Sequence, residues 1–500
     1  MSNIKIGWSE VELMPKGRKV NLAGQFYERI SDEVESTLTV TALVLDSGDD
    51  CAIFCGCDLV STSYQFLQTV RGFLKDRSDI PAEKVMVSAI HTHTAPQYAR
   101  RSDTASCIKN NLTSLNVLRQ ILPNAKYEEL VKYEGNDLFG GEEAHSYMAE
   151  QVAIAVKKAW DSRSEGCYAT GFGRAAVGLC RRVCYDDGSA KMWGDTNMAN
   201  FDELEAGNDS GIELMFTFTP DHKLTGVIAN VSCPAQVLEH RNFISSDYWG
   251  KVKENLRARF GEEIFLLGLC APAGDQCPRD LVRWVEPESP INDPNIVREN
   301  VLPRKADPSM FDLKGCKLIG KRIANEIFYA FDEIDEYFTD VPLQHKVCKL
   351  PLPLRRVTIE EYEKAVAAIR DFEKQNGEKP INYVDNARLH VHAGAIARYN
   401  VQQEVNTVDI EVHFIRFGQL AFATNPYELF LNYGNQIRAR SRAEQTFLIQ
   451  LSCGAYGYLP TKKAEGGSHY SAYVSSGSVG HVAGDMLVRK TLQEINDMWE

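Results

Sequence analysis

Apolar runs alternate with polar turns and amphipathic segments through the first hundred residues of the chain. Residues 39–46 (TVTALVLD) and 51–60 (CAIFCGCDLV) are rich in aliphatic side chains and are separated by a Ser-Gly-Asp-Asp turn, which predicts a β-hairpin. Residues 64–76 then have the spacing of an amphipathic helix, and residues 85–90 form the next apolar run. The order strand, helix, strand predicts an α/β core.

The remainder of the chain contains the same mixture of segments. Helical spacing predicts helices over residues 144–160, 359–376 and 483–497. Apolar runs predict strands over residues 211–219, 226–232, 264–270, 409–417, 420–424 and 446–453. Polar stretches at 100–143 and 278–312 indicate long excursions, which often cover sites. No internal repeat or linker is evident, so we expect one large α/β domain over residues 1–500, with a mixed β-sheet core, flanking helices and long insertions.

Composition and charge narrow the class of protein. Hydrophobic residues make up 44% of the 500 positions, enough for a substantial core, and the formal net charge is −13. An acidic surface argues against general binding to nucleic acid or anionic membranes, so the expected partner is a small-molecule substrate. No stretch approaches the roughly 20 apolar residues of a membrane span, and the N-terminus has no signal-peptide core. Thirteen cysteines without a CxxC pair indicate reduced thiols and a cytoplasmic protein; nothing in the pattern indicates its oligomeric state.

The most informative segment follows the apolar run at residues 85–90. The run ends in His91 and His93, and Thr-Ala-Pro then breaks the strand. Side chains at i and i+2 of an extended backbone point the same way, so both imidazoles leave the strand end on one face. Two imidazoles together can bind a divalent metal, or one can bind it while the other moves protons. On local grounds both could equally be ordinary loop histidines.

Three further strand ends carry unusual polar residues, and strand-end loops build sites. They are residues 230–247, with Cys233, Gln236, Glu239, His240 and Asp247; residues 273–279, with Asp275, Cys277 and Arg279; and residues 423–458, with Glu428 and Tyr458. Each also has a structural interpretation. Asp275 can cap a turn, Glu428 can begin a helix, and the cysteines can fill the core.

Segments from these four strand ends, in this order, resemble motifs of the neutral/alkaline (non-lysosomal) ceramidase family, from Gly7 to about Val488. His91-Thr-His93-Thr-Ala-Pro96 is similar to the family's His-Thr-His-Ser-Gly-Pro, and Gly274-Asp275-Gln-Cys277-Pro278 to its Gly-Asp-Val-Ser-Pro. Asn425-Pro-Tyr-Glu428 resembles its Pro-Gly-Glu, and Gly457-Tyr458 its Gly-Tyr. One such motif is weak, whereas four in order are fairly specific.

The family is a zinc amidase, so the resemblance implies a zinc-dependent hydrolase that cleaves an amide bond. It implies metal-ligand roles for His91, Glu428 and Tyr458 and an acid/base role for His93. The family's active serine falls on Cys277. Its active-site arginine falls on Arg181, with Arg182 as the alternative.

The chain departs from the family pattern at three points. The second metal histidine is missing, because its context reads Cys233-Pro234 here; Cys233 could replace it, His240 could replace it, or the metal could be lost. Cys277 is either a nucleophile with a lowered pKa or a group that does not attack. We expect neither a secretion signal nor the family's C-terminal β-sandwich domain, so extracellular ceramide is not the expected substrate.

These features together predict a hydrolase that uses metal-activated water on an N-acyl amide. His93 would protonate the departing amine, and Tyr458 or an arginine would stabilise the oxyanion. Asp58 would either hold a ligand histidine or cap a turn.

Two alternatives remain open from the sequence. The first is a metal-dependent hydrolase or lyase acting on a polar carbohydrate or uronide, such as a glycoside, for which Trp193, Trp249 and Trp284 would suit sugar stacking. The second is a non-catalytic relative that keeps the fold and has lost the metal.

Overall fold

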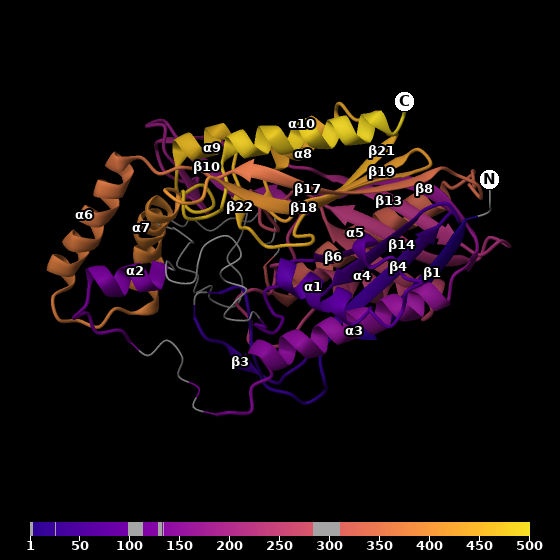
Figure 1. Cartoon of the computed structure of the whole chain (residues 1–500), viewed down its shortest axis with the longest axis horizontal. Helices are drawn as coiled ribbons and strands as arrows, with labels where there is room; N and C mark the ends of the chain where they lie inside the picture. The colour runs from indigo at the N-terminus through magenta and orange to yellow at the C-terminus, as the bar shows by residue number, and fades with distance from the viewer. Residues whose placement is uncertain (1–3, 26, 99–113, 129–132, 134, 284–310) are drawn as a thin grey trace.

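Three β-sheets, whose strands are connected in the same way, form the centre of the molecule (Figure 1). The computed structural model of the protein describes residues 4–25, 27–98, 114–128, 133, 135–283 and 311–500. In each sheet an outer strand pairs antiparallel with a hairpin, and a final strand returns parallel to the second hairpin strand. A parallel return needs a crossover connection, and a helix supplies it in all three sheets.

The first sheet has the order β6-β5-β4-β1-β7. Its strands are β1 (Lys5–Glu12), β4 (Thr39–Asp46), β5 (Cys51–Cys57), β6 (Val85–Ala89) and β7 (Ser164–Glu165). Helix α1 (Tyr64–Gly72) connects β5 to β6, and α3 (Gly141–Asp161) packs across β1 and β4 with ten buried side chains along one stripe.

The second sheet has the order β15-β14-β13-β8. Its strands are β8 (Cys167–Arg174), β13 (Gly211–Phe218), β14 (Leu224–Val231) and β15 (Phe265–Cys270). Helix α4 (Tyr248–Phe260) connects β14 to β15, and it packs with α5 (Asp312–Asp332) over this sheet.

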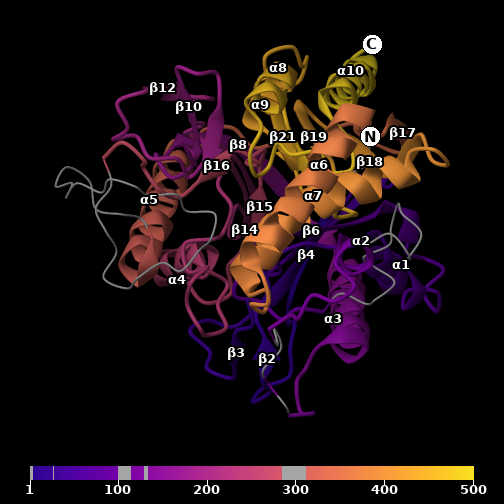
Figure 2. The same cartoon turned by 90° about the vertical axis from the view of Figure 1, so that its left-hand side faces the viewer.

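The third sheet has the order β17-β18-β19-β21. Its strands are β17 (Leu343–Pro353), β18 (Thr407–Phe417), β19 (Leu420–Thr424) and β21 (Gln445–Ile449). Helix α8 (Leu431–Arg438) connects β19 to β21, and α10 (His481–Asp497) covers β17 and β18. Figure 2 shows the three helix layers on three sides of the sheets, with α4 and α5 at the left, α1 and α3 at the lower right, and α8 and α10 at the top.

The remaining elements are a separate group of three helices, several short strands and two short helices. Helices α2 (Ser114–Ile121), α6 (Ile359–Asn376) and α7 (Tyr383–Val401) pack together around Leu118, Ile369 and Ile396 and project from the sheets (Figure 1). The others are β2 (Val20–Asn21), β3 (Ile30–Ser31), η1 (Ala82–Lys84), β9 (Leu179–Cys180), β10 (Arg182–Tyr185), β11 (Ala190–Met192), β12 (Phe201–Leu204), β16 (Gln276–Cys277), β20 (Glu428–Leu429), β22 (Tyr458–Leu459) and α9 (Lys462–Gly467).

The ends of the three parallel pairs meet. The Ala235 N–H donates to the Ile90 carbonyl at 3.3 Å and joins the first sheet to the second. The Gln450 N–H donates to the Cys270 carbonyl at 3.0 Å and joins the second sheet to the third. Because both strands of a parallel pair end at the same edge, this convergence gathers the loops after six strands in one place.

The predicted fold class is confirmed: the chain is a single large α/β domain with several sheets and flanking helices. Parts of both predicted excursions, which are residues 100–113, 129–132, 134 and 284–310 and include Trp284, lie outside the described residues. No helix in the described part of the chain has the length and apolar character that crossing a bilayer requires.

Candidate functional site

His91 lies in a cradle of backbone carbonyls that fixes its ring. The backbone N–H of His91 donates to the Leu59 carbonyl at 3.0 Å, and its Nδ1 donates to the Val60 carbonyl at 2.6 Å. His91 has φ 70°, which lies in the left-handed region and turns the chain sharply at the end of β6. With Nδ1 occupied as a donor, the lone pair of a neutral ring is on Nε2.

Glu428 lies opposite that lone pair. Its Oε2 is 3.5 Å from His91 Nε2, and its backbone N–H donates to the Gly457 carbonyl at 3.0 Å. Strands β20 and β22 pair in parallel, with Glu428 directly opposite Tyr458. Burial would raise the pKa of Glu428, but His91, Arg181 and a hydrogen bond from Tyr458 outweigh it and lower the pKa below its usual 4.5.

His93 is next to His91, with ring centroids 4.8 Å apart and the rings nearly perpendicular. Its Nδ1 is 3.1 Å from Glu239 Oε2, an ion-pair distance without the alignment of a hydrogen bond. Burial, reinforced by His91 and Arg29, holds the pKa of His93 well below 6.5, whereas burial raises the pKa of Glu239 to about 7. His93 is therefore a neutral imidazole at physiological pH.

Arg181 and Arg182 have different surroundings although they are adjacent. Arg181 donates to Gln236 Oε1 at 3.2 Å, to the Gly274 carbonyl at 3.1 Å and to the Tyr458 hydroxyl at 3.4 Å. Arg182 instead pairs with Glu205 at 2.8 Å and donates to carbonyls of the segment at residues 464–470. Of the two predicted arginines, Arg181 therefore contacts Tyr458, and Arg182 is paired elsewhere.

The two cysteines predicted as site residues, Cys277 and Cys233, are buried thiols. Cys277 Sγ donates to the Arg279 carbonyl at 3.2 Å, and burial raises the pKa of Cys277 to about 12. Cys233 Sγ donates to the Val177 carbonyl at 3.4 Å, and burial raises the pKa of Cys233 well above 9. Neither environment favours a thiolate, which is the form that attacks or binds a metal.

His240 lies against Phe311, with ring centroids 6.3 Å apart. Among the described residues neither ring nitrogen has a hydrogen-bond partner, and burial lowers the pKa of His240 to about 4. The contacts described above gather five of the predicted residues, which are His91, His93, Arg181, Glu428 and Tyr458. They leave Cys233 and His240 outside that group.

The aspartates near these loops cap backbone groups. Asp58 accepts from the Thr39 N–H at 2.8 Å, so Val60 and not Asp58 is the partner of His91 Nδ1. Asp247 accepts from the Tyr248 N–H at 2.7 Å as the N-cap of α4. Asp275 accepts from the Leu431 N–H at 2.9 Å at the start of α8.

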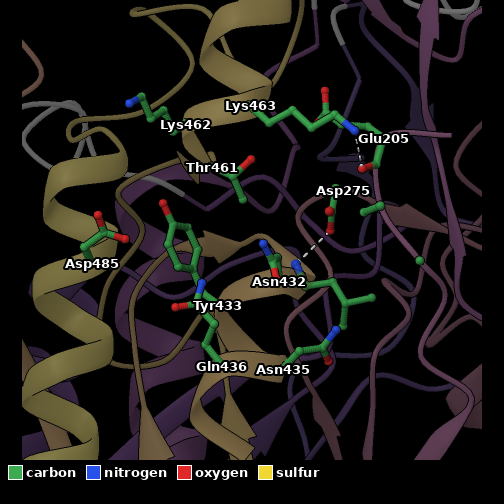
Figure 3. A pocket seen from close by; sticks show the side chains of 13 residues that line it. Glu205, Asp275, Asn432, Tyr433, Asn435, Gln436, Thr461, Lys462, Lys463 and Asp485 are labelled. Carbon is green, nitrogen blue, oxygen red and sulfur yellow. Dashed lines mark hydrogen bonds between the residues drawn. The ribbon is translucent and has the colours of Figure 1, made fainter. Parts of the chain in front are cut away.

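Asp275 also lines a surface pocket of about 410 Å³ (Figure 3). Figure 3 shows its carboxylate bonded to the α8 backbone, with Tyr433 and Asp485 on the opposite side. The lining of this pocket includes neither His91 nor Tyr458, so it is separate from the gathered residues.

The donor set around His91 fits a zinc ion. Two ligands on a tetrahedron with bonds of about 2.1 Å are about 3.4 Å apart, close to the 3.5 Å between His91 Nε2 and Glu428 Oε2. Tyr458 adds a hydroxyl beside Glu428. Imidazole nitrogen and carboxylate oxygen are ligands that zinc accepts, and the fixed Val60 contact leaves Nε2 free to bind.

A second group of potential metal ligands lies away from His91. Within the described part of the chain, Glu411, His413 and Cys453 form the one group of three His, Cys, Asp or Glu residues whose donor atoms all lie within 4.8 Å of one another. All three are buried, and they lie on β18 and after β21, not at the His91 strand end.

Sequence reasoning missed two residues that hold the site in place, Arg29 and Gly24. Arg29 donates to the carbonyls of His93 and Glu239, both at 2.6 Å, and so clamps the two loops together. Gly24 has φ 91°, and a Cβ there would lie 2.4 Å from His93 Cγ. A glycine in a polar stretch is a weak indication of such close approach, and nothing local marks Arg29.

The tryptophans that would suit sugar stacking pack in the core. Trp193 is 4% exposed and Trp249 is 3% exposed. Trp193 packs edge-on against Phe311, with ring centroids 5.5 Å apart, and Trp249 packs beside Tyr248 at 5.2 Å. Buried aromatic pairs of this kind are typical of core packing.

Comparison with known proteins supports the fold. No protein-family model matches the chain, and no curated protein sequence matches it. A solved structure of neutral ceramidase from Pseudomonas aeruginosa matches with a TM-score of 0.66 at 13% identity, over 98% of this chain and 74% of that one. A solved structure of a ceramidase complexed with C2 matches with a TM-score of 0.65 at 11% identity, over the same shares. At such low identity the likeness establishes a ceramidase-like fold.

Proposed function

We propose that this chain is a metal-dependent hydrolase that cleaves an amide (N-acyl) bond in a small-molecule substrate, with zinc as its metal and the whole chain as one catalytic domain. The observation that carries the proposal is the 3.5 Å approach of His91 Nε2 and Glu428 Oε2, with Tyr458 directly across the β20–β22 pair. The ceramidase-like fold supports an amide as the bond that is cleaved.

His91, Glu428 and Tyr458 would hold the metal. Catalytic zinc sites commonly have three protein ligands and one open position, so the missing family histidine is compatible with a working site. When bound, zinc lowers the pKa of a water molecule towards neutrality and polarises a carbonyl. The remaining chemistry belongs to the side chains around it.

His93 is suited to move the proton. Its ring contacts His91, its Nε2 is buried without a partner among the described residues, and burial keeps it neutral. A neutral imidazole can take a proton during attack and give it to the departing amine. Glu239 Oε2 lies 3.1 Å from His93 Nδ1.

Arg181 and Tyr458 would stabilise the negative charge that develops on the carbonyl oxygen. The Arg181 guanidinium is fixed by Gln236 and the Gly274 carbonyl and keeps one nitrogen 3.4 Å from the Tyr458 hydroxyl. A fixed, buried cation needs no reorganisation when charge develops. Cys277 is a buried thiol whose pKa is raised to about 12, so we take water as the attacking group.

A polar carbohydrate or uronide substrate is the second candidate. It is favoured by buried polar atoms of the segment at residues 236–240 that lack partners in the described part of the chain: Gln236 Nε2, Glu239 Oε1 and both ring nitrogens of His240. Such atoms are costly unless a ligand or water bonds to them. Hydroxyl and carboxylate groups of a sugar acid would satisfy them better than an alkyl chain.

The experiment is a hydrolysis screen with purified, zinc-loaded protein. N-acyl amides of increasing chain length are assayed beside glycosides and uronides, with and without a chelator. Chelator-sensitive release of an amine supports the first proposal, and chelator-sensitive cleavage of a glycoside or uronide supports the second. Absence of both, with no zinc retained by the wild type, contradicts the enzymatic assignment and favours a non-catalytic relative.

A further inference from the structure

Glu411 and His413 lie two residues apart on β18, so their side chains leave the strand on one face. Cys453 approaches that face from the segment after β21, where it has φ 59°. Glu411 is 8% exposed, Cys453 is 1% exposed and His413 is fully buried. A carboxylate, an imidazole and a thiol thus share a largely buried space.

A chain of hydrogen bonds runs through this cluster. His345 Nδ1 is 3.0 Å from the Cys51 carbonyl, His345 Nε2 is 2.9 Å from His413 Nδ1, and His413 Nε2 is 3.1 Å from Glu411 Oε1. The carbonyl and the carboxylate can only accept, so these contacts require three N–H groups on the two rings. Two neutral imidazoles supply two, and the pair must therefore carry one extra proton when nothing else is bound.

That extra proton places two positive charges beside one negative charge. Arg71 donates to both oxygens of Glu411, at 2.7 and 3.0 Å, so the carboxylate already has a cationic partner. A buried imidazolium next to a buried guanidinium is an expensive arrangement.

We propose that Glu411, His413 and Cys453 form a second metal site, separate from the His91 site, which binds one divalent transition-metal ion of the zinc type. The ion would bind His413 Nε2, Cys453 Sγ and a Glu411 oxygen, a nitrogen, sulfur and oxygen set that suits zinc and not magnesium or calcium.

Binding exchanges one dication for two protons. The proton on His413 Nε2 and the proton on the Cys453 thiol leave to solvent, and the metal takes both positions, so the net charge of the cluster is unchanged. His413 Nδ1–H then donates to His345 Nε2, and His345 Nδ1–H donates to the Cys51 carbonyl, so both rings are neutral and every nitrogen has a partner. Arg71 holds the ligating carboxylate, as outer partners of metal ligands commonly do.

The site would fasten two strands that lead to the His91 neighbourhood. The Cys453 N–H donates to the Val87 carbonyl on β6, two residues before the strand ends. The His413 N–H donates to Thr424 Oγ1 at the end of β19, four residues before Glu428. A metal here is therefore expected to be structural.

Cobalt(II) reports on the site because a cysteine thiolate bound to cobalt gives a charge-transfer band in the near ultraviolet. The probe is CoCl₂ added to the full chain, and the variants are Cys453→Ser, His91→Asn, Cys233→Ser and Cys55→Ser. We expect the band in the wild type, in His91→Asn and in both control cysteine variants, and its loss in Cys453→Ser. Metal analysis should give two equivalents in the wild type and one in both His91→Asn and Cys453→Ser.

The second site and the proposed function fail in different ways. No band in the wild type, or a band that survives in Cys453→Ser and disappears in Cys233→Ser, overturns the second site. If Cys453→Ser does not fold, the test is a calorimetric titration of His91→Asn with cobalt in buffers of different ionisation enthalpy, which counts the protons released. Release of two protons per cobalt supports the exchange, and release of none overturns it.

Discussion

Glu428 and Tyr458, thirty residues apart in the chain, are direct partners across the two-residue parallel pair of β20 and β22. The Glu428 N–H donates to the carbonyl of Gly457 at 3.0 Å, and the Arg181 guanidinium donates to the Tyr458 hydroxyl at 3.4 Å. This short pair places Tyr458 opposite Glu428, whose Oε2 is 3.5 Å from His91 Nε2. The geometry of the candidate site thus depends on backbone hydrogen bonds as much as on side chains.

Replacing His91 tests the metal assignment. His91 has φ 70°, so His91→Asn is preferable to an alanine substitution, because asparagine tolerates the left-handed region. We expect loss of the Nε2 ligand to weaken metal binding and hydrolysis by at least about a hundredfold. Metal analysis and the hydrolysis assay measure this.

The matched control is His222→Asn. His222 is exposed and also has a positive φ, 64°, so the substitution is equivalent in backbone terms. It should leave metal content and activity at wild-type levels. Equal activity in both variants would show that His91 is not a ligand.

Arg181 and Arg182 should respond differently to replacement by lysine. In Arg181→Lys the fork that reaches Gln236, Gly274 and Tyr458 is lost, so kcat should fall roughly a hundredfold with a small change in unfolding free energy. In Arg182→Lys the pair with Glu205 and the carbonyl contacts are lost, so the free energy of unfolding should fall by about 1–3 kcal/mol. Urea denaturation and steady-state kinetics separate the two effects, and the reverse pattern would exchange the two roles.

Gly274 should be intolerant of a side chain. A Cβ at this position would lie 2.3 Å from the Glu428 carbonyl oxygen, a backbone atom that cannot rotate away. Gly274→Ala should therefore lower the free energy of unfolding by about 1–3 kcal/mol and disturb the position of Glu428. Gly207→Ala is the control, because a Cβ at Gly207 would meet nothing within 4 Å in the described part of the chain beyond its own neighbours in sequence. This control should change stability by less than about 0.5 kcal/mol in urea denaturation.

Cys277 should not be required as a nucleophile. Burial raises its pKa to about 12, and Sγ donates to the Arg279 carbonyl, a bond that a serine hydroxyl can also make. We expect Cys277→Ser to keep activity within a few-fold of the wild type and iodoacetamide at neutral pH to leave the enzyme active. A loss comparable to that of His91→Asn would instead make the thiol essential.

Glu239 should make stability depend on pH. Burial raises the pKa of Glu239 from 4.5 to about 7, so the folded state favours the protonated carboxyl. Below pH 4.5 both folded and unfolded states are protonated and there is no penalty; as the pH rises towards 7 the unfolded carboxyl ionises first, and the wild type loses up to roughly 3 kcal/mol of stability.

Glu239→Gln cannot ionise, so its free energy of unfolding should lack this loss. Urea denaturation at about pH 4.5 and about pH 8 measures the difference between wild type and variant on either side of the transition. The free energy of unfolding of Glu239→Gln should therefore increase relative to that of the wild type as the pH increases. An equal difference at both values would mean that the carboxyl is not held protonated by burial.

Local patterns located several elements accurately. Strands 39–46 and 420–424 and helix 359–376 have the bounds that the sequence predicted, because their apolar spacing and caps are local. Strand β5 ends at Cys57, three residues before its predicted end, because the carbonyls of Leu59 and Val60 turn to hold His91. Strand β17 went unpredicted, since its two prolines suit only an edge position that the sheet itself defines.

The sequence by itself determined the fold class, the strand ends that carry polar residues and the candidate ligands His91, Glu428 and Tyr458. Tertiary structure alone decided that Arg181 and not Arg182 reaches Tyr458, that Val60 orients His91, and that Glu411, His413 and Cys453 meet. The reason is physical. Hydrophobic periodicity is local and can be read along the chain, whereas the meeting of three sheets depends on hydrogen bonds between residues such as Gln450 and Cys270, which are distant in sequence.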